Sequence, residues 1–247
     1  MTKRIAVIFD YDFTLIDCNS DTYVFERLWP SRPAIVQELY AEQFQQWTRS
    51  MDQAFALYYQ HHPKNASRQT ILSTVAHVPV QEQMLEAIRY SHALADLFIV
   101  SDANTDFIHA FLEKEGIQHL FTHVISNTPT NTDGRFGVAP YFDFVTREPH
   151  GCSLQCPPNM CKGKIVQDEL QILQTYERVI YLGDGLGDFC PCHRLRETDY
   201  ALARADFPLA KHIQENPIVA NVRLWKSGHD VYQLLATLLK ENESKAS

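Results

Sequence analysis

The chain has 247 residues, of which 45% are hydrophobic and 21% are charged, and its formal net charge is −8. This length and composition are those of an ordinary globular protein with one domain, or with one domain that carries a smaller insertion. The acidic balance argues against a nucleic-acid-binding protein, and no apolar run approaches the roughly 20 residues needed to span a bilayer.

The N-terminal segment and the cysteines indicate a cytoplasmic protein. The apolar stretch that follows Lys3 and Arg4 covers only residues 5–9, which is shorter than the apolar region of a signal peptide. Without an export signal, we expect the six cysteines to be reduced thiols rather than disulfides. We expect neither a nucleic-acid nor a membrane partner, and the sequence leaves the oligomeric state open.

Four short apolar runs predict buried parallel strands, because they are partly β-branched and are bounded by turn or polar residues. Helical patterns at residues 106–115 and 164–176 separate several of these runs. This alternation is typical of an α/β fold with an open, doubly wound, mostly parallel sheet. The four runs are residues 5–9, 97–100, 179–182 and the weaker 200–203.

The stretch from about residue 21 to residue 90 has no strand-like run and contains many aromatic residues. A set of its apolar residues recurs at steps of four and three, which predicts an amphipathic helix that packs in a core rather than a cofactor-binding box. We interpret residues 17–90 as a helical cap inserted into a core made of residues 1–16 and 91–247. The recurring residues are Tyr40, Phe44, Trp47, Met51, Phe55 and Tyr58.

Polar clusters directly follow three of the predicted strands. The first strand runs into Asp10 and Asp12, the second into Ser101 and Asp102, and the third into Asp184. Since ligands of open α/β sheets bind beyond the carboxyl ends of the strands, the three clusters are expected to converge on one crevice.

Two carboxylates at such a strand end suit phosphate chemistry. Asp10 can attack phosphorus to form an aspartyl-phosphate, while Asp12 protonates the leaving alcohol and later deprotonates water. A Mg²⁺ ion would neutralise the phosphate and the carboxylates, with Asp184 as a further ligand. Acidic residues also end strands as simple turn or cap residues. The pair therefore indicates catalysis only together with Ser101, Lys162 and Asp184, which occur in the expected order.

The sequence resembles the haloacid dehalogenase (HAD) superfamily of phosphatases, which has a Rossmann-like α/β core. The superfamily shows an apolar strand that ends in Asp-x-Asp-x-Thr, a second that ends in Ser or Thr, a lysine before a helix, and a third strand that ends in an acidic pair. The matching positions are residues 5–14, Ser101, Lys162, and Asp184 with Asp188.

Four longer segments are similar to the PHOSPHO family of phosphoethanolamine/phosphocholine phosphatases and pyridoxal phosphate phosphatases. The family has a helical cap inserted after the first motif, as interpreted above for residues 17–90. The similar segments are residues 17–21, 101–104, 158–162 and 183–191.

The resemblance implies a role for each matching residue. Asp10 would be the nucleophile and a Mg²⁺ ligand, and Asp12 the general acid/base whose backbone carbonyl also reaches the metal. Ser101 and Lys162 would hold the phosphoryl oxygens, and Lys162 would also offset the charge of Asp10. We prefer Lys162 to the nearby Lys164, because the match over residues 158–162 fixes the register.

Further residues would complete the metal and substrate sites. The resemblance implies that Asp184 binds Mg²⁺, directly or through water, and that Asp188 and Thr14 support the residues around the metal. Asp21 and Asp102 match positions that contact the ammonium group of the substrate in choline- and ethanolamine-directed members. The less favoured alternative is that both residues cap helices.

The chain departs from the family in two places. Gly187 stands where the family usually has Asn, so a side-chain amide near the metal is missing. The cap also matches poorly after Asp21, which affects the substrate prediction more than the chemistry, because caps determine specificity.

Cysteines and a histidine upstream of Lys162 raise the alternative of a zinc site. Cys152, Cys156 and Cys161 lie close in sequence with His150 nearby, but they lack the paired Cys-x-x-Cys of a typical zinc site. We therefore expect buried reduced thiols here.

Together these features predict a Mg²⁺-dependent phosphatase that hydrolyses a small phosphorylated metabolite through an aspartyl-phosphate. Phosphoethanolamine or phosphocholine is the first expected substrate, because Asp21 and Asp102 are both present. Pyridoxal 5′-phosphate is the alternative substrate. A phosphotransferase and a non-catalytic binder of a phosphorylated ligand remain the other open functions.

Overall fold

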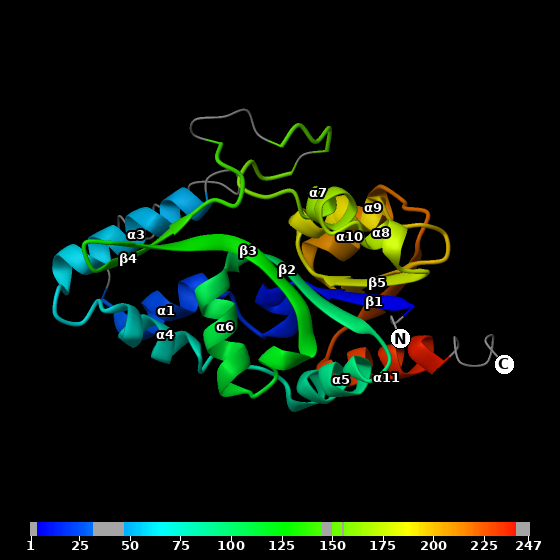
Figure 1. The fold of residues 1–247 in the computed structure, drawn as a ribbon, viewed down its shortest axis with the longest axis horizontal. Helices are drawn as coiled ribbons and strands as arrows, with labels where there is room; N and C mark the ends of the chain where they lie inside the picture. Colours follow the sequence, from blue (N-terminus) through cyan, green and yellow to red (C-terminus); the bar gives the residue numbers. More distant parts are fainter. Residues whose placement is uncertain (1–3, 32–46, 145–149, 155, 241–247) are drawn as a thin grey trace.

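The computed structural model describes residues 4–31, 47–144, 150–154 and 156–240, which form an α/β fold around one seven-stranded sheet (Figure 1). The strand order is β4-β3-β2-β1-β5-β6-β7, and only β4 is antiparallel to its neighbour. The strands are β1 (Ile5–Phe9), β2 (Asp96–Asn104), β3 (Phe121–Thr132), β4 (Arg135–Ala139), β5 (Arg178–Gly183), β6 (Tyr200–Arg204) and β7 (Asn221–Trp225).

Helices cover both faces of the sheet, because the central strands are apolar on both sides. In β1, Ala6 and Ile8 belong to one buried cluster, and Val7 and Phe9 belong to the other. The first cluster includes residues of α8 (Ile172–Thr175), α9 (Phe189–His193) and α10 (Pro208–Glu215), together with Ile165 and Val166, which directly follow α7 (Lys162–Lys164). The second lies under α5 (Glu82–His92), α6 (Thr105–Lys114) and α11 (Gly228–Lys240), on the opposite side of the sheet (Figure 1).

The predicted doubly wound fold is thus confirmed, and the four predicted runs lie in β1, β2, β5 and β6. The predicted helix at residues 106–115 corresponds to α6, and Gly116 follows it with a left-handed φ of 67°. The helix predicted at residues 164–176 is wrong as a single element. A wide helical turn at Ile165–Glu169 follows α7. Gln171, with a left-handed φ of 51°, then interrupts the helical conformation before α8.

The segment between β1 and β2 is helical, as predicted, with α1 (Ser20–Leu28), α3 (Trp47–His61) and α4 (Arg68–Val75) ahead of α5. In α3, Met51, Phe55 and Tyr58 are buried, so that part of the apolar stripe packs in a core. Tyr40 and Phe44 of the same stripe lie outside the described residues.

The hairpin of β3 and β4 also contacts this helical segment, and the sequence had not indicated it. Phe136 of β4 lies with its ring centroid 4.9 Å from that of Phe55 in α3 and 5.5 Å from that of Phe107 in α6. The division into a core and a cap of residues 17–90 stays a prediction. Among the described residues no helix combines the length and apolarity that crossing a bilayer requires.

Candidate active site

The carboxyl ends of β1, β2 and β5 lie side by side, because the sheet order places β1 between the other two. A cavity of about 210 Å³ opens beside them and contains most of the acidic residues singled out in the sequence. Its lining residues are Asp10, Asp12, Phe13, Asn19, Trp47, Asp102, Lys162, Asp184, Gly185, Leu186, Gly187 and Asp188.

The chain turns sharply after β1, which brings both carboxylates of the first motif to the cavity. Asp10 still bonds to the sheet through its amide, 3.0 Å from the carbonyl of Leu182, and the chain then forms a wide turn over Tyr11–Leu15. Phe13, with φ 53°, adopts the left-handed region in this turn. Asp10 and Asp12 are both buried and line the same cavity.

Hydrogen bonds from the backbone hold these two side chains in place. The amide of Tyr11 donates to Asp10 Oδ1 at 2.7 Å, and the amide of Ser20 donates to Asp12 Oδ1 at 2.9 Å. Burial is the largest cause that raises the pKa of Asp12 well above its ordinary value, and the charge of Asp21 adds to it. A proton on Asp12 is therefore stabilised, which suits a general acid.

Lys162 supplies the positive charge of the cavity. Its Nζ lies 2.8 Å from Asp10 Oδ2 and 2.9 Å from Asp188 Oδ1, and the side chain is only 4% exposed. Burial alone would lower its pKa, but Asp10 and Asp188 outweigh that effect, and the pKa is raised well above its ordinary value. Lys164, by contrast, pairs with Asp168 at 3.3 Å near the surface.

Asp184 and Asp188 complete the acidic cluster. Asp188 is fully buried, and its carboxylate accepts a hydrogen bond from the Tyr181 hydroxyl at 2.7 Å. It also accepts hydrogen bonds from the backbone amides of Asp184 and Gly185, at 3.1 and 3.0 Å. The hydroxyl of Thr14 donates to Asp184 Oδ1 at 3.0 Å. These contacts fix the orientation of both carboxylates.

The cluster fits a Mg²⁺ ion. Asp10, Asp184 and Asp188 each offer a carboxylate oxygen, and these oxygens lie within 4.8 Å of one another. Burial first, and the neighbouring Asp188 second, raise the pKa of Asp10 well above its ordinary value and that of Asp184 to about 7. Lys162 offsets only part of the negative charge of these carboxylates. A cation that prefers oxygen ligands, such as Mg²⁺, would therefore stabilise the cluster.

Asp102, Ser101 and Asp21, the remaining predicted phosphate- and substrate-binding residues, differ in their position relative to the cavity. Asp102 lines the cavity, with Oδ1 4.0 Å from Lys162 Nζ. Ser101 is fully buried, and its hydroxyl accepts from the amide of Ala103 at 3.3 Å. Asp21 is also buried, but its carboxylate accepts from Trp47 Nε1 at 2.8 Å and is not part of the cavity lining.

Trp47 is the cavity residue that the sequence interpretation placed elsewhere. Its position in an apolar stripe indicated a core residue, whereas the structure shows it half-buried at the first turn of α3 and beside the cavity. Phe13 and Leu186, with 36% and 48% of their surfaces exposed, add an apolar rim. No periodicity in the sequence distinguishes such rim residues from core residues.

Comparison with known proteins identifies relatives over nearly the whole chain. A family model described as Putative Phosphatase matches residues 5–239. Inorganic pyrophosphatase 2 of Arabidopsis thaliana is 36% identical, over 97% of this chain and 85% of the relative. A thiamine phosphate phosphatase-like protein of the same plant is 34% identical, over 98% and 99% of the two chains. The pyridoxal phosphate phosphatase PHOSPHO2 of Homo sapiens is 28% identical, over 96% and 100%.

Solved structures share the fold at low sequence identity. A HAD family hydrolase from Salmonella enterica serovar Typhi has a TM-score of 0.64 and 14% identity, over 97% of this chain and 72% of the other. A phospho-aspartyl intermediate analogue of phosphoserine phosphatase has a TM-score of 0.61 and 13% identity, over 95% and 99%.

Proposed function

We propose that this chain, which belongs to the PHOSPHO family of HAD phosphatases, hydrolyses small phosphate monoesters by attack of Asp10 on phosphorus with Mg²⁺ bound. One observation carries the proposal. Asp10 Oδ2 lies 2.8 Å from Lys162 Nζ in a cavity that Asp12 and Asp184 also line. A nucleophile, a general acid, a phosphate-binding cation and metal ligands are thereby within reach of one phosphoryl group.

Hydrolysis proceeds in two steps in this arrangement. An oxygen of Asp10 forms a bond to phosphorus while the ester bond breaks, and Asp12 gives its proton to the leaving oxygen. Asp12 then takes a proton from a water molecule that attacks the aspartyl-phosphate and releases inorganic phosphate. Lys162, which contacts Asp10 directly, would hold a phosphoryl oxygen, and buried Ser101 would support the same group.

Asp10, Asp184 and the backbone carbonyl of Asp12 would hold the metal ion, with Asp188 and Thr14 fixing the carboxylates. Bound Mg²⁺ would offset the negative charge that gathers on the phosphoryl oxygens. A chelated sample should therefore lose phosphate release and recover it when Mg²⁺ is restored. A release rate that chelation leaves unchanged would exclude the metal requirement.

For the substrate, we favour a phosphate monoester that also carries a positive charge, such as phosphoethanolamine or phosphocholine. Asp102 and Trp47 line the same cavity as Asp10, and a carboxylate and an indole face both attract a cation. Asp21 would act indirectly in this proposal, because it accepts a hydrogen bond from Trp47 rather than lining the cavity. Thiamine phosphate, a cation that the name of one relative specifies, belongs to the same class.

Pyridoxal 5′-phosphate is the second candidate. The apolar rim of Phe13 and Leu186 can contact an aromatic ring, and the human relative is named for this substrate. Phosphate release should be compared across phosphoethanolamine, phosphocholine, thiamine phosphate, pyridoxal 5′-phosphate and pyrophosphate. A higher kcat/KM for the cationic esters is expected, and a clear preference for pyridoxal phosphate or pyrophosphate would overturn the cation proposal.

A further inference from the structure

Four cysteines from two separate parts of the chain meet beside α7 and α9. Cys152 and Cys156 lie in the segment before α7, Cys161 caps the N-terminus of α7, and Cys190 lies in α9. Their sulfurs all lie within 4.8 Å of one another, although Cys190 is distant from the others in sequence. Cys161 and Cys190 are buried, and the other two are half-buried.

The sulfur–sulfur distances match a single tetrahedral metal ion. The pairs Cys152–Cys156, Cys152–Cys190 and Cys161–Cys190 are each separated by 3.7 Å. A Zn²⁺ ion with Zn–S bonds of about 2.3 Å holds its four sulfurs about 3.8 Å apart. A disulfide would require about 2.05 Å, and all four cysteines are free. A cluster of several iron ions would hold some of the sulfurs farther apart than 4.8 Å, because its thiolates are divided between different irons.

Nitrogen donors around the sulfurs favour thiolates. The amide of Lys164 lies 3.4 Å from Cys161 Sγ. The guanidinium of Arg194 donates to Cys190 Sγ at 3.4 Å and to Cys152 Sγ at 3.7 Å. Hydrogen bonds and a nearby cation stabilise metal-bound thiolates, so these donors are the surroundings that such a site needs.

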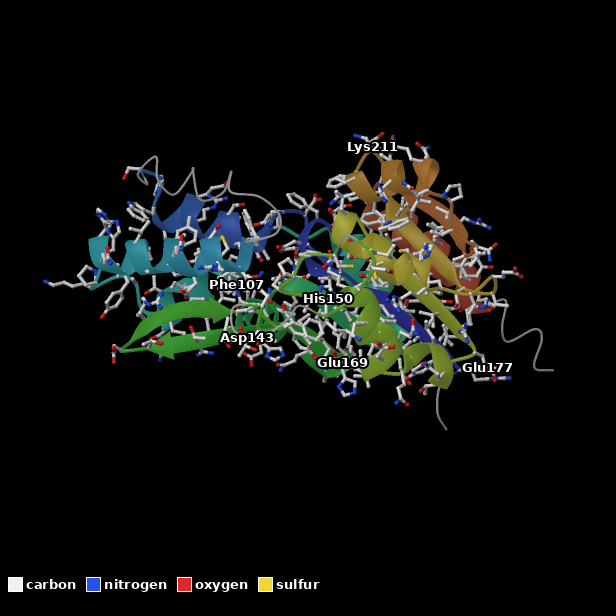
Figure 2. The ribbon with its side chains drawn as sticks, turned by 90° about the horizontal axis from the view of Figure 1, so that it is seen from above. Phe107, Asp143, His150, Glu169, Glu177 and Lys211 are labelled. Atoms are coloured by element: carbon white, nitrogen blue, oxygen red, sulfur yellow. The ribbon has the colours of Figure 1, made fainter. Side chains whose placement is uncertain are left out.

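His150 is not part of this ligand set. Its Nε2 lies 2.9 Å from the carbonyl of Pro157, and its Nδ1 accepts from the amide of Cys152 at 3.3 Å. Both ring nitrogens are therefore used within the loop, and Figure 2 labels His150 near the centre of the view, beside the yellow-green segment that carries α7. The ligands consist of sulfur alone.

We propose that Cys152, Cys156, Cys161 and Cys190 bind one structural Zn²⁺ ion. Four protein ligands leave no open position for a substrate or a water molecule, which is typical of a structural rather than a catalytic zinc site. The site is separate from the carboxylate cluster, so it does not depend on the function proposed above.

The zinc would connect the two segments that supply Lys162 and Asp188. Cys161 directly precedes Lys162, and Cys190 follows Asp188 by two residues, while Lys162 Nζ lies 2.9 Å from Asp188 Oδ1. Gly163 allows this approach, because a Cβ at that position would overlap Cys190 Sγ. We therefore expect the ion to stabilise the placement of Lys162 as well as the fold.

The proposal is tested by measuring the zinc content of the full chain, purified without chelators and dialysed against metal-free buffer. One zinc per chain is expected by mass spectrometry of the metals. Cys152→Ser and Cys156→Ser should each reduce this content at least tenfold, whereas Cys18→Ser, at a half-buried cysteine outside the group, should retain it. Equal zinc content in all four proteins would overturn the proposal.

A second measurement covers the case in which the serine variants fail to fold. The full chain, freed of zinc and loaded with Co²⁺, should show the intense thiolate-to-cobalt absorption and visible bands of a tetrahedral sulfur site. X-ray absorption of the zinc form should show four sulfur neighbours. Absence of thiolate absorption, oxygen neighbours, or recovery of the four cysteines as disulfides in the freshly purified protein would each contradict the proposal.

Discussion

Lys162 Nζ and Asp10 Oδ2 lie 2.8 Å apart, and both side chains are almost completely buried. Lys162 reaches the cavity from the start of α7, and Asp10 from the end of β1. A buried lysine so close to the proposed nucleophile would hold the charge of that carboxylate in place and would leave a donor for a phosphoryl oxygen. This contact joins Asp10, the proposed nucleophile, to Lys162, the residue proposed to bind the phosphate.

Replacing Lys162 should impair catalysis far more than replacing its neighbour two residues away. We expect Lys162→Ala to lower kcat/KM for phosphate release by about 10²-fold or more, because a buried cation at the phosphoryl group is lost. Lys164→Ala is the matched control, since Lys164 pairs with Asp168 near the surface. Similar losses in the two variants would contradict the role of Lys162.

Replacing Asp102 should distinguish substrates by their charge. We expect Asp102→Asn to raise KM for phosphocholine by about tenfold, because a carboxylate that attracts the cation becomes neutral. The KM for pyrophosphate should change little, since this ligand has no cation. An equal effect on both substrates, measured by phosphate release, would show that Asp102 does not select for positive charge.

Position 187 offers a gain-of-function test near the proposed metal ligands. A Cβ at Gly187 would find Lys162 Cε at 3.9 Å as its nearest atom, so a side chain can begin at this position without a clash at its Cβ. Gly187→Asn should lower the Mg²⁺ concentration for half-maximal activity by up to about tenfold, because it adds an amide beside the carboxylates. Gly187→Ala is the control that adds the Cβ alone. An unchanged Mg²⁺ requirement in the asparagine variant would show that the amide is not needed.

Burial of Asp21 should make stability depend on pH. Burial raises the pKa of Asp21 from 3.8 to about 7, although the hydrogen bond from Trp47 opposes this. Because the pKa of Asp21 is higher in the folded than in the unfolded state, Asp21 destabilises the fold progressively as the pH rises from about 4 to about 7. Above about pH 7 this destabilisation no longer increases. Asp21→Asn should therefore raise the Tm more at pH 8 than at pH 5, by at least about 2 °C. An equal gain at both pH values would contradict this.

Much of the fold and site could be predicted from local pattern. Four strands, β1, β2, β5 and β6, were recognisable because buried parallel strands are continuously apolar. Asp10 and Asp184 were recognisable as site residues because they directly follow two of these strands. The hairpin of β3 and β4 could not be recognised, because β3 is mostly polar, is buried only at two adjacent residues and has no clear apolar run.

What could not be predicted depends on contacts between distant segments. Cys190 joins the other three cysteines only because α7 and α9 pack together at Gly163. Trp47 contacts Asp21 and lines the cavity only because the start of α3 approaches the start of α1, whereas its spacing alone is that of a core residue. Neither contact leaves a periodic signal in the sequence.

Asp10 is the residue on which the proposed mechanism depends. Asp10→Asn should reduce turnover by about 10³-fold or more while the Tm shows that the protein stays folded, because an amide is a poor nucleophile. Undiminished phosphate release in this variant would remove Asp10 from the mechanism.

The most direct test is to locate the phosphoryl group on the enzyme during turnover. The reaction would be quenched in acid, treated with tritiated borohydride, which reduces an acyl phosphate to the alcohol, and mapped by peptide mass spectrometry. If Asp10 is the nucleophile, the label appears at position 10 as homoserine and is absent from Asp10→Asn. Label at any other residue, or turnover without any labelled residue, would contradict an aspartyl-phosphate at Asp10.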